Sequence, residues 1–170
     1  KDVDSSLFFA KIGTTTTPKE EAGAFVATKL TDIKMVPDSV KARHILLKYT
    51  KTYKDTTLRG KLDSIKTVIE HGGNFAKIAN SISEDVGSAI KGGDLGWFKD
   101  GAMVKPFNDA CFNGKVGDLV IVQTKYGFHL IEITAQASKV KKVQLAKLLK
   151  IITPSSATYD AVFAKASAFY

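Results

Sequence analysis

The sixteen residues from Gly92 to Phe107, GGDLGWFKDGAMVKPF, constrain the fold more than any other part of the sequence. They combine four glycines with apolar and aromatic side chains, in an order that matches neither the helical nor the strand period. Glycine favours positive φ angles and close approach of two backbones, whereas a simple linker would carry few large apolar groups. A segment that is both backbone-constrained and apolar is typical of a loop that builds one wall of a pocket.

Composition is typical of an ordinary globular chain. Hydrophobic residues make up 44% and charged residues 25% of the 170 positions, which suits one domain with appendages or two small domains. No apolar run approaches the roughly 18 residues of a membrane span. The sequence begins at Lys1 without a methionine, so we expect a piece of a longer protein, whose parent could still be membrane-anchored.

Charge and cysteine content argue against several classes of site. The net charge is +8, but only Arg43 and Arg59 among the 25 cationic residues are arginine, the residue that nucleic-acid readers favour. We therefore predict a solvated lysine-rich surface and no nucleic-acid partner. The single cysteine, Cys111, excludes an internal disulfide and a cysteine-based metal cluster. We predict that Cys111 is a small buried hydrophobe, and we predict no metal or cofactor.

Periodicity and punctuation predict an α+β domain over residues 39–135. A helix carrying Leu58, Leu62, Ile65 and Ile69 should end at Gly72, and Asn74 should cap the next helix. The other expected elements are a strand at 42–48, a strand-like loop after residue 92, a short helix that begins near Pro106, and a hairpin formed by 119–122 and 127–133.

The flanking segments suggest part of another module. Residues 1–38 contain a strand-like stretch at 24–35, and residues 136–170 contain a strand or helix followed by an amphipathic C-terminal helix. We expect the stretches at 24–35 and 140–152 to lie side by side as a stub of a second module. An absent portion or a partner should cover the apolar stripe of the last helix, which comprises Tyr159, Val162, Phe163, Ala166, Phe169 and Tyr170.

Two histidines stand in predicted strands, His44 in the first strand of the domain and His129 in the last. Taken alone, each histidine is better explained as a hydrogen-bonded core residue than as a catalytic one. Together with Asp85 and the apolar Gly92–Phe107 run, they form a candidate site of two imidazoles, one carboxylate and an apolar cup. His71 follows a predicted helix C-terminus, where a cation is favoured, and we assign it no function.

Four successive motifs resemble those of the parvulin-type peptidyl-prolyl isomerases. They are ARHILLK at 42–48, FAKIANSISEDVGSAIKGGDLGWF at 75–98, MVKPFNDACF at 103–112 and YGFHLIEI at 126–133. The resemblance implies a four-stranded, mainly antiparallel sheet surrounded by about four helices. It implies a site in which His44 and His129 are paired, Asp85 lies beside them and Thr124 links the network. It also implies an apolar cup for the proline ring, formed by Leu95, Met103 and Phe107.

Three further aromatic residues belong to these motifs. Tyr126 stands where many relatives of the family carry a small or hydroxyl residue, and we group it with the substrate-binding residues. We expect Trp97 and Phe98 to be packing residues.

Some parvulins recognise phosphate through a basic loop after the first strand. Lys48, Lys51 and Lys54 occupy that loop here without an arginine pair, which favours a solvated loop.

The resemblance implies catalysis of rotation about X–Pro bonds, which face a barrier of roughly 18–20 kcal/mol. The flanks resemble the surroundings of a parvulin module in PpiD/SurA-like bacterial envelope foldases. We therefore expect a periplasmic or envelope protein that acts on unfolded, proline-containing polypeptides. A binding module for such chains, with a weak or inactive isomerase site, is the alternative.

Overall fold

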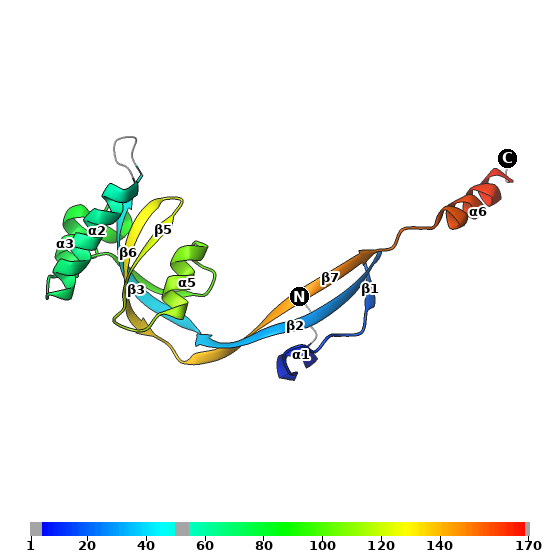
Figure 1. The fold of residues 1–170 in the computed structure, drawn as a ribbon, viewed down its shortest axis with the longest axis horizontal. Helices are drawn as coiled ribbons and strands as arrows, with labels where there is room; N and C mark the ends of the chain where they lie inside the picture. Colours follow the sequence, from blue (N-terminus) through cyan, green and yellow to red (C-terminus); the bar gives the residue numbers. More distant parts are fainter. Residues whose placement is uncertain (1–4, 50–54, 169–170) are drawn as a thin grey trace. The chain divides into compact units, whose positions relative to one another are not determined.

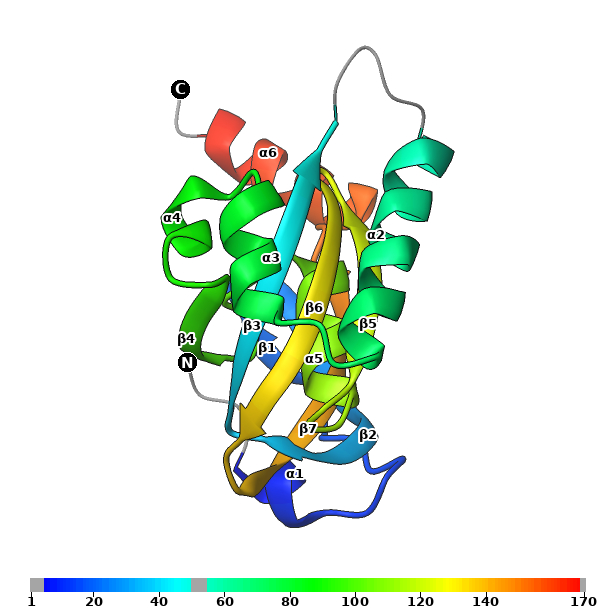
Figure 2. The same cartoon turned by 90° about the vertical axis from the view of Figure 1, so that its left-hand side faces the viewer.

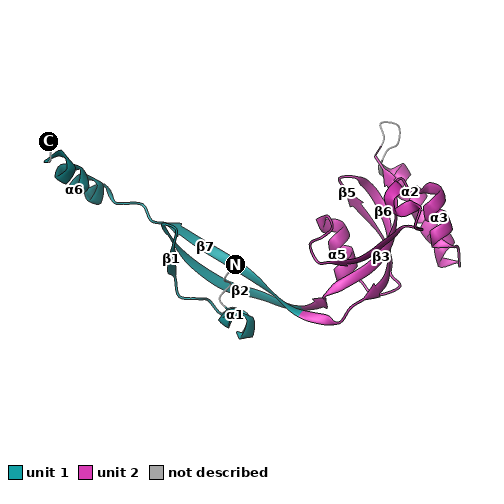
Figure 3. Ribbon diagram, turned by 180° about the vertical axis from the view of Figure 1, so that it is seen from behind, with its two compact units in different colours: residues 1–34, 141–170 teal, residues 35–140 magenta. Residues whose placement is uncertain are grey.

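The computed structural model describes residues 5–49 and 55–168, which form two compact units (Figures 1 and 3). The central unit comprises residues 35–140, and the flanking unit comprises residues 1–34 and 141–170. The predicted α+β domain, 39–135, lies within the central unit.

The central unit is built on a four-stranded antiparallel sheet with the order β4-β3-β6-β5. Its strands are β3 (Ser39–Lys48), β4 (Asp94–Lys99), β5 (Leu119–Thr124) and β6 (Gly127–Gln136). Its described helices are α2 (Asp55–Glu70), α3 (Phe75–Ile82), α4 (Val86–Ala89) and α5 (Lys105–Asn113). The expected α+β fold with a four-stranded sheet and about four helices is therefore confirmed.

Both faces of the sheet are covered because β3 and β6 carry apolar residues on both sides. One set of alternate residues, including Ala42, Ile131 and Ile133, packs against Phe107, Cys111 and Phe112 of α5. The other set, Ile45, Phe128 and Leu130, packs against Leu58 and Leu62 of α2 and Phe75 and Ala79 of α3. Figure 2 shows α2 and α3 in front of the two central strands and α5 behind them. The site residues His44 and His129 belong to the α5 side.

Two sequence signals in the central unit have the expected local consequences. The side chain of Asn74 accepts a hydrogen bond from the backbone N–H of Lys77 at 2.9 Å and so caps α3. Cys111 is fully buried, and burial raises the pKa of its thiol to about 12. The predicted helix cap at Asn74 and the predicted burial of Cys111 are therefore confirmed.

The Gly92–Phe107 run contains a regular strand, β4, rather than only a loop. β4 forms one edge of the sheet, and in its second half the buried Phe98 stands between the exposed Trp97 and Lys99. Phe98 is buried, as expected, but Trp97 is 54% exposed, so the prediction that it packs in the core is wrong. Trp97 pairs with Lys41 across the strands, and as a residue of an edge strand it leaves more than half of its side chain open to solvent.

Gly93 shows why the run needs glycine. Its φ is +84°, and a Cβ atom at this position would lie 2.4 Å from the carbonyl oxygen of His44. The Gly93 carbonyl also accepts a hydrogen bond from the backbone N–H of His44 at 2.9 Å. The glycine thus allows the chain after α4 to approach the strand that carries the first site histidine.

The flanking unit contains a three-stranded sheet with the order β1-β2-β7. Its strands are β1 (Lys19–Glu21), β2 (Ala24–Pro37) and β7 (Lys139–Ile151), and its helices are α1 (Ser6–Phe9) and α6 (Ser156–Ser167). The stretch at 140–152 is therefore a strand, and its predicted pairing with 24–35 is confirmed. That this sheet is a stub of a second module remains a proposal.

Helix α6 exposes its apolar side chains. Tyr159, Val162 and Phe163 are each more than 60% exposed, whereas Phe169 and Tyr170, predicted to share their stripe, lie outside the described residues. Among the helices that the structure describes, none is long and apolar enough to cross a membrane.

Candidate active site

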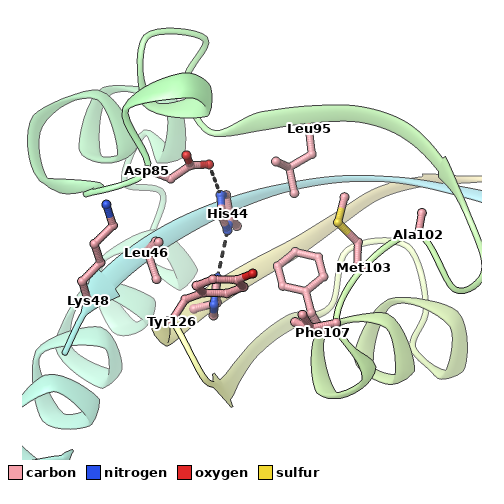
Figure 4. Close-up of a pocket in the computed structure, with 11 residues that line it drawn as sticks. His44, Leu46, Lys48, Asp85, Leu95, Ala102, Met103, Phe107 and Tyr126 are labelled. Atoms are coloured by element: carbon pink, nitrogen blue, oxygen red, sulfur yellow. Dashed lines mark hydrogen bonds and ion pairs between the residues drawn. The ribbon is translucent and has the colours of Figure 1, made fainter.

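A cavity of about 470 Å³ opens on the α5 side of the sheet and gathers the predicted site residues (Figure 4). Seven of the eight residues named from the sequence line it, and Thr124 contacts one of them, His129, from behind. The lining comprises His44, Leu46, Lys48, Asp85, Leu95, Ala102, Met103, Val104, Phe107, Tyr126 and His129. This volume lies within the range that is typical of small-molecule sites.

The two histidines form the polar floor of this cavity. The Nδ1 atoms of His44 on β3 and His129 on β6 lie 3.1 Å apart, and both residues are 5% exposed. On the far side of His44, its Nε2 lies 2.8 Å from Oδ2 of Asp85. On the far side of His129, its Nε2 lies 2.8 Å from Oγ1 of Thr124. Asp85, His44, His129 and Thr124 thus form a continuous hydrogen-bonded chain, the histidine network.

The chemistry of the end groups assigns a direction to these hydrogen bonds. A carboxylate only accepts, so the Nε2 of His44 carries the proton that it donates to Asp85. In a neutral imidazole the other nitrogen then accepts, so Nδ1–H of His129 donates to Nδ1 of His44. The Nε2 of His129 must accept in turn from the hydroxyl of Thr124. The backbone N–H of Tyr126 donates to the same hydroxyl oxygen at 3.1 Å, which satisfies Thr124 on both sides.

Electrostatics support this assignment of protons. Burial, followed by the proximity of His44, lowers the pKa of His129 to about 4. Burial also lowers the pKa of His44 and outweighs the opposite effect of Asp85. Burial tends to raise the pKa of Asp85, but hydrogen bonds from Ser88 and His44 outweigh it, so the net shift is downward. At neutral pH the network therefore holds two neutral imidazoles and one carboxylate.

Three apolar residues form a wall beside the histidines, which we call the cup: Leu95 from β4, Met103 from the segment before α5, and Phe107 from α5. The ring of Phe107 meets both imidazoles edge-on, with centroids 5.6 Å from His44 and 5.4 Å from His129. Phe107 is 3% exposed, so it joins the site to the core that α5 forms. An apolar ring bound here would contact the cup on one side and the imidazoles on the other.

Tyr126 and Lys48 lie at the margin of the cavity. Tyr126 occupies the turn between β5 and β6 and is 53% exposed, so its ring is accessible to a bound chain. Lys48 ends β3, and its backbone N–H is hydrogen-bonded to the carboxylate of Glu84. Lys51 and Lys54, the other lysines of the predicted basic loop, lie outside the described residues.

Sequence reasoning missed several residues at this site. Leu46, Ala102 and Val104 line the cavity, and alternation from His44 already placed Leu46 on the same face of β3. Ser88 is buried, and its hydroxyl contacts both Asp85 and His44. Its spacing of three residues from Asp85 was the signal that could have found it, because such residues share one side of a helical turn.

Among the described residues, no group of histidine, cysteine, aspartate or glutamate side chains has the arrangement of a metal site. The network instead offers fixed dipoles next to an apolar cup. Such a site can bind a small ring and stabilise a change in charge distribution close to it.

Comparison with known proteins assigns the chain to a family. The family described as the PPIC-type PPIase domain, that is, peptidyl-prolyl isomerase, matches residues 25–137. The foldase protein PrsA of Geobacillus sp. (strain WCH70) is 45% identical over 101 residues, which are 59% of this chain and 33% of that protein. The chaperone SurA of Methylococcus capsulatus is 38% identical over 130 residues, covering 72% of this chain and 28% of SurA.

A solved structure supports the same assignment. The crystal structure of the peptidylprolyl isomerase PrsA from Bacillus cereus aligns with a TM-score of 0.50 and 35% identity, covering 60% of this chain and 36% of that one. This chain spans about a third of the length of the curated relatives named above. The family match extends over more than half of the chain and includes every residue of the cup and of the histidine network. The chain therefore belongs to the PPIC-type, or parvulin, family of peptidyl-prolyl cis-trans isomerases, as a parvulin module like those of the PrsA and SurA foldases.

Proposed function

We propose that the cavity catalyses cis–trans isomerisation of X–Pro bonds in unfolded polypeptides, with the proline ring in the cup. The observation that carries this proposal is the placement of the apolar cup and the histidine network in one cavity, joined by Phe107. The catalytic roles proposed for His44, His129, Asp85 and Thr124, and the binding roles of Leu95, Met103, Phe107 and Tyr126, rest on this arrangement.

The reaction requires no bond to be broken. Rotation of the amide is slow because conjugation must be lost at the transition state. A catalyst has to bind the twisted amide better than either planar isomer. The cup would hold the pyrrolidine ring, while the imidazole dipoles lie beside the amide whose charge distribution changes. Because each imidazole is restricted to one tautomer and one orientation, these dipoles need no reorganisation during the rotation.

The proposed substrates are unfolded or nascent proline-containing chains of the cell envelope. The similarity to PrsA foldases and SurA chaperones supports both the substrate class and a periplasmic or envelope location. The cavity also suits such substrates, because Tyr126 and Lys48 leave its margin accessible to a chain that continues beyond the proline.

A protease-free tetrapeptide isomerisation assay tests the proposal on the chain and on three variants. We expect the wild-type chain to accelerate the exchange, and His44→Ala and Met103→Ala to lose most of that acceleration. Met103 is only half-buried, so its removal perturbs the cup with less risk to folding than a change at Phe107. Trp97→Ala is the control, because it removes a larger side chain that is exposed and does not line the cavity.

The same experiment addresses the alternative of a binding module with a weak or inactive isomerase site. A wild-type chain that binds the peptide without accelerating its exchange would overturn the proposed catalysis. Acceleration that survives in both site variants would mean that the cavity is not the catalytic centre.

A further inference from the structure

Ser88 makes a three-way contact at the acidic end of the histidine network. It is 4% exposed, and its Oγ lies 2.5 Å from Oδ2 of Asp85 and 3.1 Å from Nε2 of His44. The carboxylate can only accept, so the hydroxyl proton points to Asp85. The Nε2–H of His44 is then shared between Oδ2 of Asp85 at 2.8 Å and the Ser88 oxygen at 3.1 Å.

The side chain of Asp85 is more accessible to solvent than that of its partner His44. The side chain of Asp85 is 35% exposed, whereas that of His44 is 7% exposed. A carboxylate with this access to water has alternative partners if it rotates away from the cavity. His44 would then lose the acceptor that keeps its proton on Nε2, and the proton could move to Nδ1. That change would reverse the hydrogen bond to His129 and mismatch the rest of the network.

The backbone holds Ser88 where it can prevent this rotation. The Ser88 carbonyl accepts a hydrogen bond from the N–H of Gly93 at 2.8 Å, and the Gly93 carbonyl accepts one from the N–H of His44 at 2.9 Å. Two hydrogen bonds through one residue therefore connect the backbone of Ser88 with the strand that carries His44. The hydroxyl is fixed relative to the imidazole and not merely to the turn that also contains Asp85.

We propose that Ser88 is a positioning residue that fixes the Asp85 carboxylate against His44 and thereby sets the direction of every hydrogen bond in the histidine network. Its effect on the reaction rate rests on the proposed isomerase function. The effect of Ser88 on the tautomer of His44 is independent of that proposed function.

The test compares the wild-type chain with Ser88→Ala and with Ser88→Thr, which restores a hydroxyl. Two-dimensional ¹⁵N–¹H NMR of the imidazoles should show one tautomer of His44 in the wild type, with the proton on Nε2, and a mixture in Ser88→Ala. In isomerisation assays, Ser88→Ala should lower kcat about tenfold, the effect of losing one hydrogen bond to a charged group, with KM unchanged. Ser88→Thr should recover both properties.

Thr134→Val is the control for loss of a hydrogen-bonded, partly buried hydroxyl elsewhere in the central sheet. The Thr134 hydroxyl donates to the carbonyl of Lys41 at 3.0 Å within the same sheet and does not line the cavity. This variant should keep the wild-type His44 tautomer and kcat. Should Ser88→Ala fail to fold, Ser88→Cys, of similar size but with a weaker donor, is read by the same two measurements.

The outcomes separate this inference from the proposed function. An unchanged His44 tautomer in a folded Ser88→Ala variant overturns the positioning role, whatever happens to the rate. A mixed tautomer with unchanged kcat overturns the claim that the direction of the hydrogen bonds matters for catalysis. A mixed tautomer in a chain whose wild type shows no isomerase activity supports the positioning role and overturns the proposed function.

Discussion

Acid should destabilise the central unit through His129. Burial and the nearby His44 lower the pKa of His129 to about 4, from 6.5 in an exposed histidine. Below pH 6.5 the unfolded chain therefore takes up a proton at this position that the folded chain does not. Stability must decrease as the pH falls from 6.5 towards 4 and then level off with respect to this group.

The size of the effect follows from the two pKa values. A difference of one pKa unit corresponds to 1.36 kcal/mol, so the full penalty is about 3 kcal/mol below pH 4. At pH 5 the unfolded residue is mostly protonated and the folded one mostly neutral, which gives about 2 kcal/mol relative to pH 7. That is a large fraction of the roughly 5–15 kcal/mol that stabilises a typical domain.

Urea unfolding at pH 7 and pH 5 measures this penalty when wild type and His129→Gln are compared. Fluorescence of Trp97, the only tryptophan, reports on the central unit, because it lies on β4. His129→Gln will be less stable at pH 7, but its free energy of unfolding should fall by about 2 kcal/mol less between the two pH values. Equal losses in the two proteins, or an NMR titration of the His129 ring with a midpoint near 6.5, would show that His129 is not the source of the acid sensitivity.

Three further predictions concern the surroundings of the site. Gly93→Ala should destabilise the chain more than Gly101→Ala and should lower isomerase activity. Both glycines have φ near +85°, but only at Gly93 would an added Cβ atom collide with the backbone of His44. Equal losses of stability in urea unfolding would contradict this prediction. Cys111 should resist thiol reagents at pH 8 until the protein unfolds, because burial raises its pKa to about 12, and rapid labelling of the native chain would be the contrary result. Thr124→Val should lower the free energy of unfolding in urea by about 1–3 kcal/mol and should also lower kcat. The reason is that Nε2 of His129 loses its hydrogen-bond donor and the backbone N–H of Tyr126 loses its acceptor. Unchanged stability and rate would count against the histidine network.

Local patterns in the sequence predicted much of the fold. The cap at Asn74, the turn between β5 and β6 and the alternation along β3 depend on neighbouring residues, so they can be recognised without the structure. Trp97 shows the limit of this reasoning. An aromatic residue beside Phe98 suggests packing, but β4 is an edge strand whose outer side faces solvent, and its position in the sheet depends on pairing with a strand more than forty residues earlier.

The site illustrates a second limit. His44, Asp85 and His129 could be named as candidates because each stands in a recognisable motif. The direction of their hydrogen bonds could not, because it depends on a contact of 3.1 Å between residues 85 positions apart. Ser88 was missed for a related reason. A serine after an aspartate resembles an ordinary turn residue until the structure shows that its hydroxyl is buried between a carboxylate and an imidazole.

NMR exchange spectroscopy of the wild-type chain with an Ala-Pro peptide shows directly whether the cavity accelerates rotation about X–Pro bonds. Catalysis produces exchange cross-peaks between the cis and trans resonances of the peptide at sub-stoichiometric protein, on a timescale where the free peptide shows none because its isomerisation takes tens to hundreds of seconds. We expect these cross-peaks, together with shift changes at the cup residues Leu95 and Met103. Shift changes at the cup without exchange cross-peaks would contradict the proposed isomerase function.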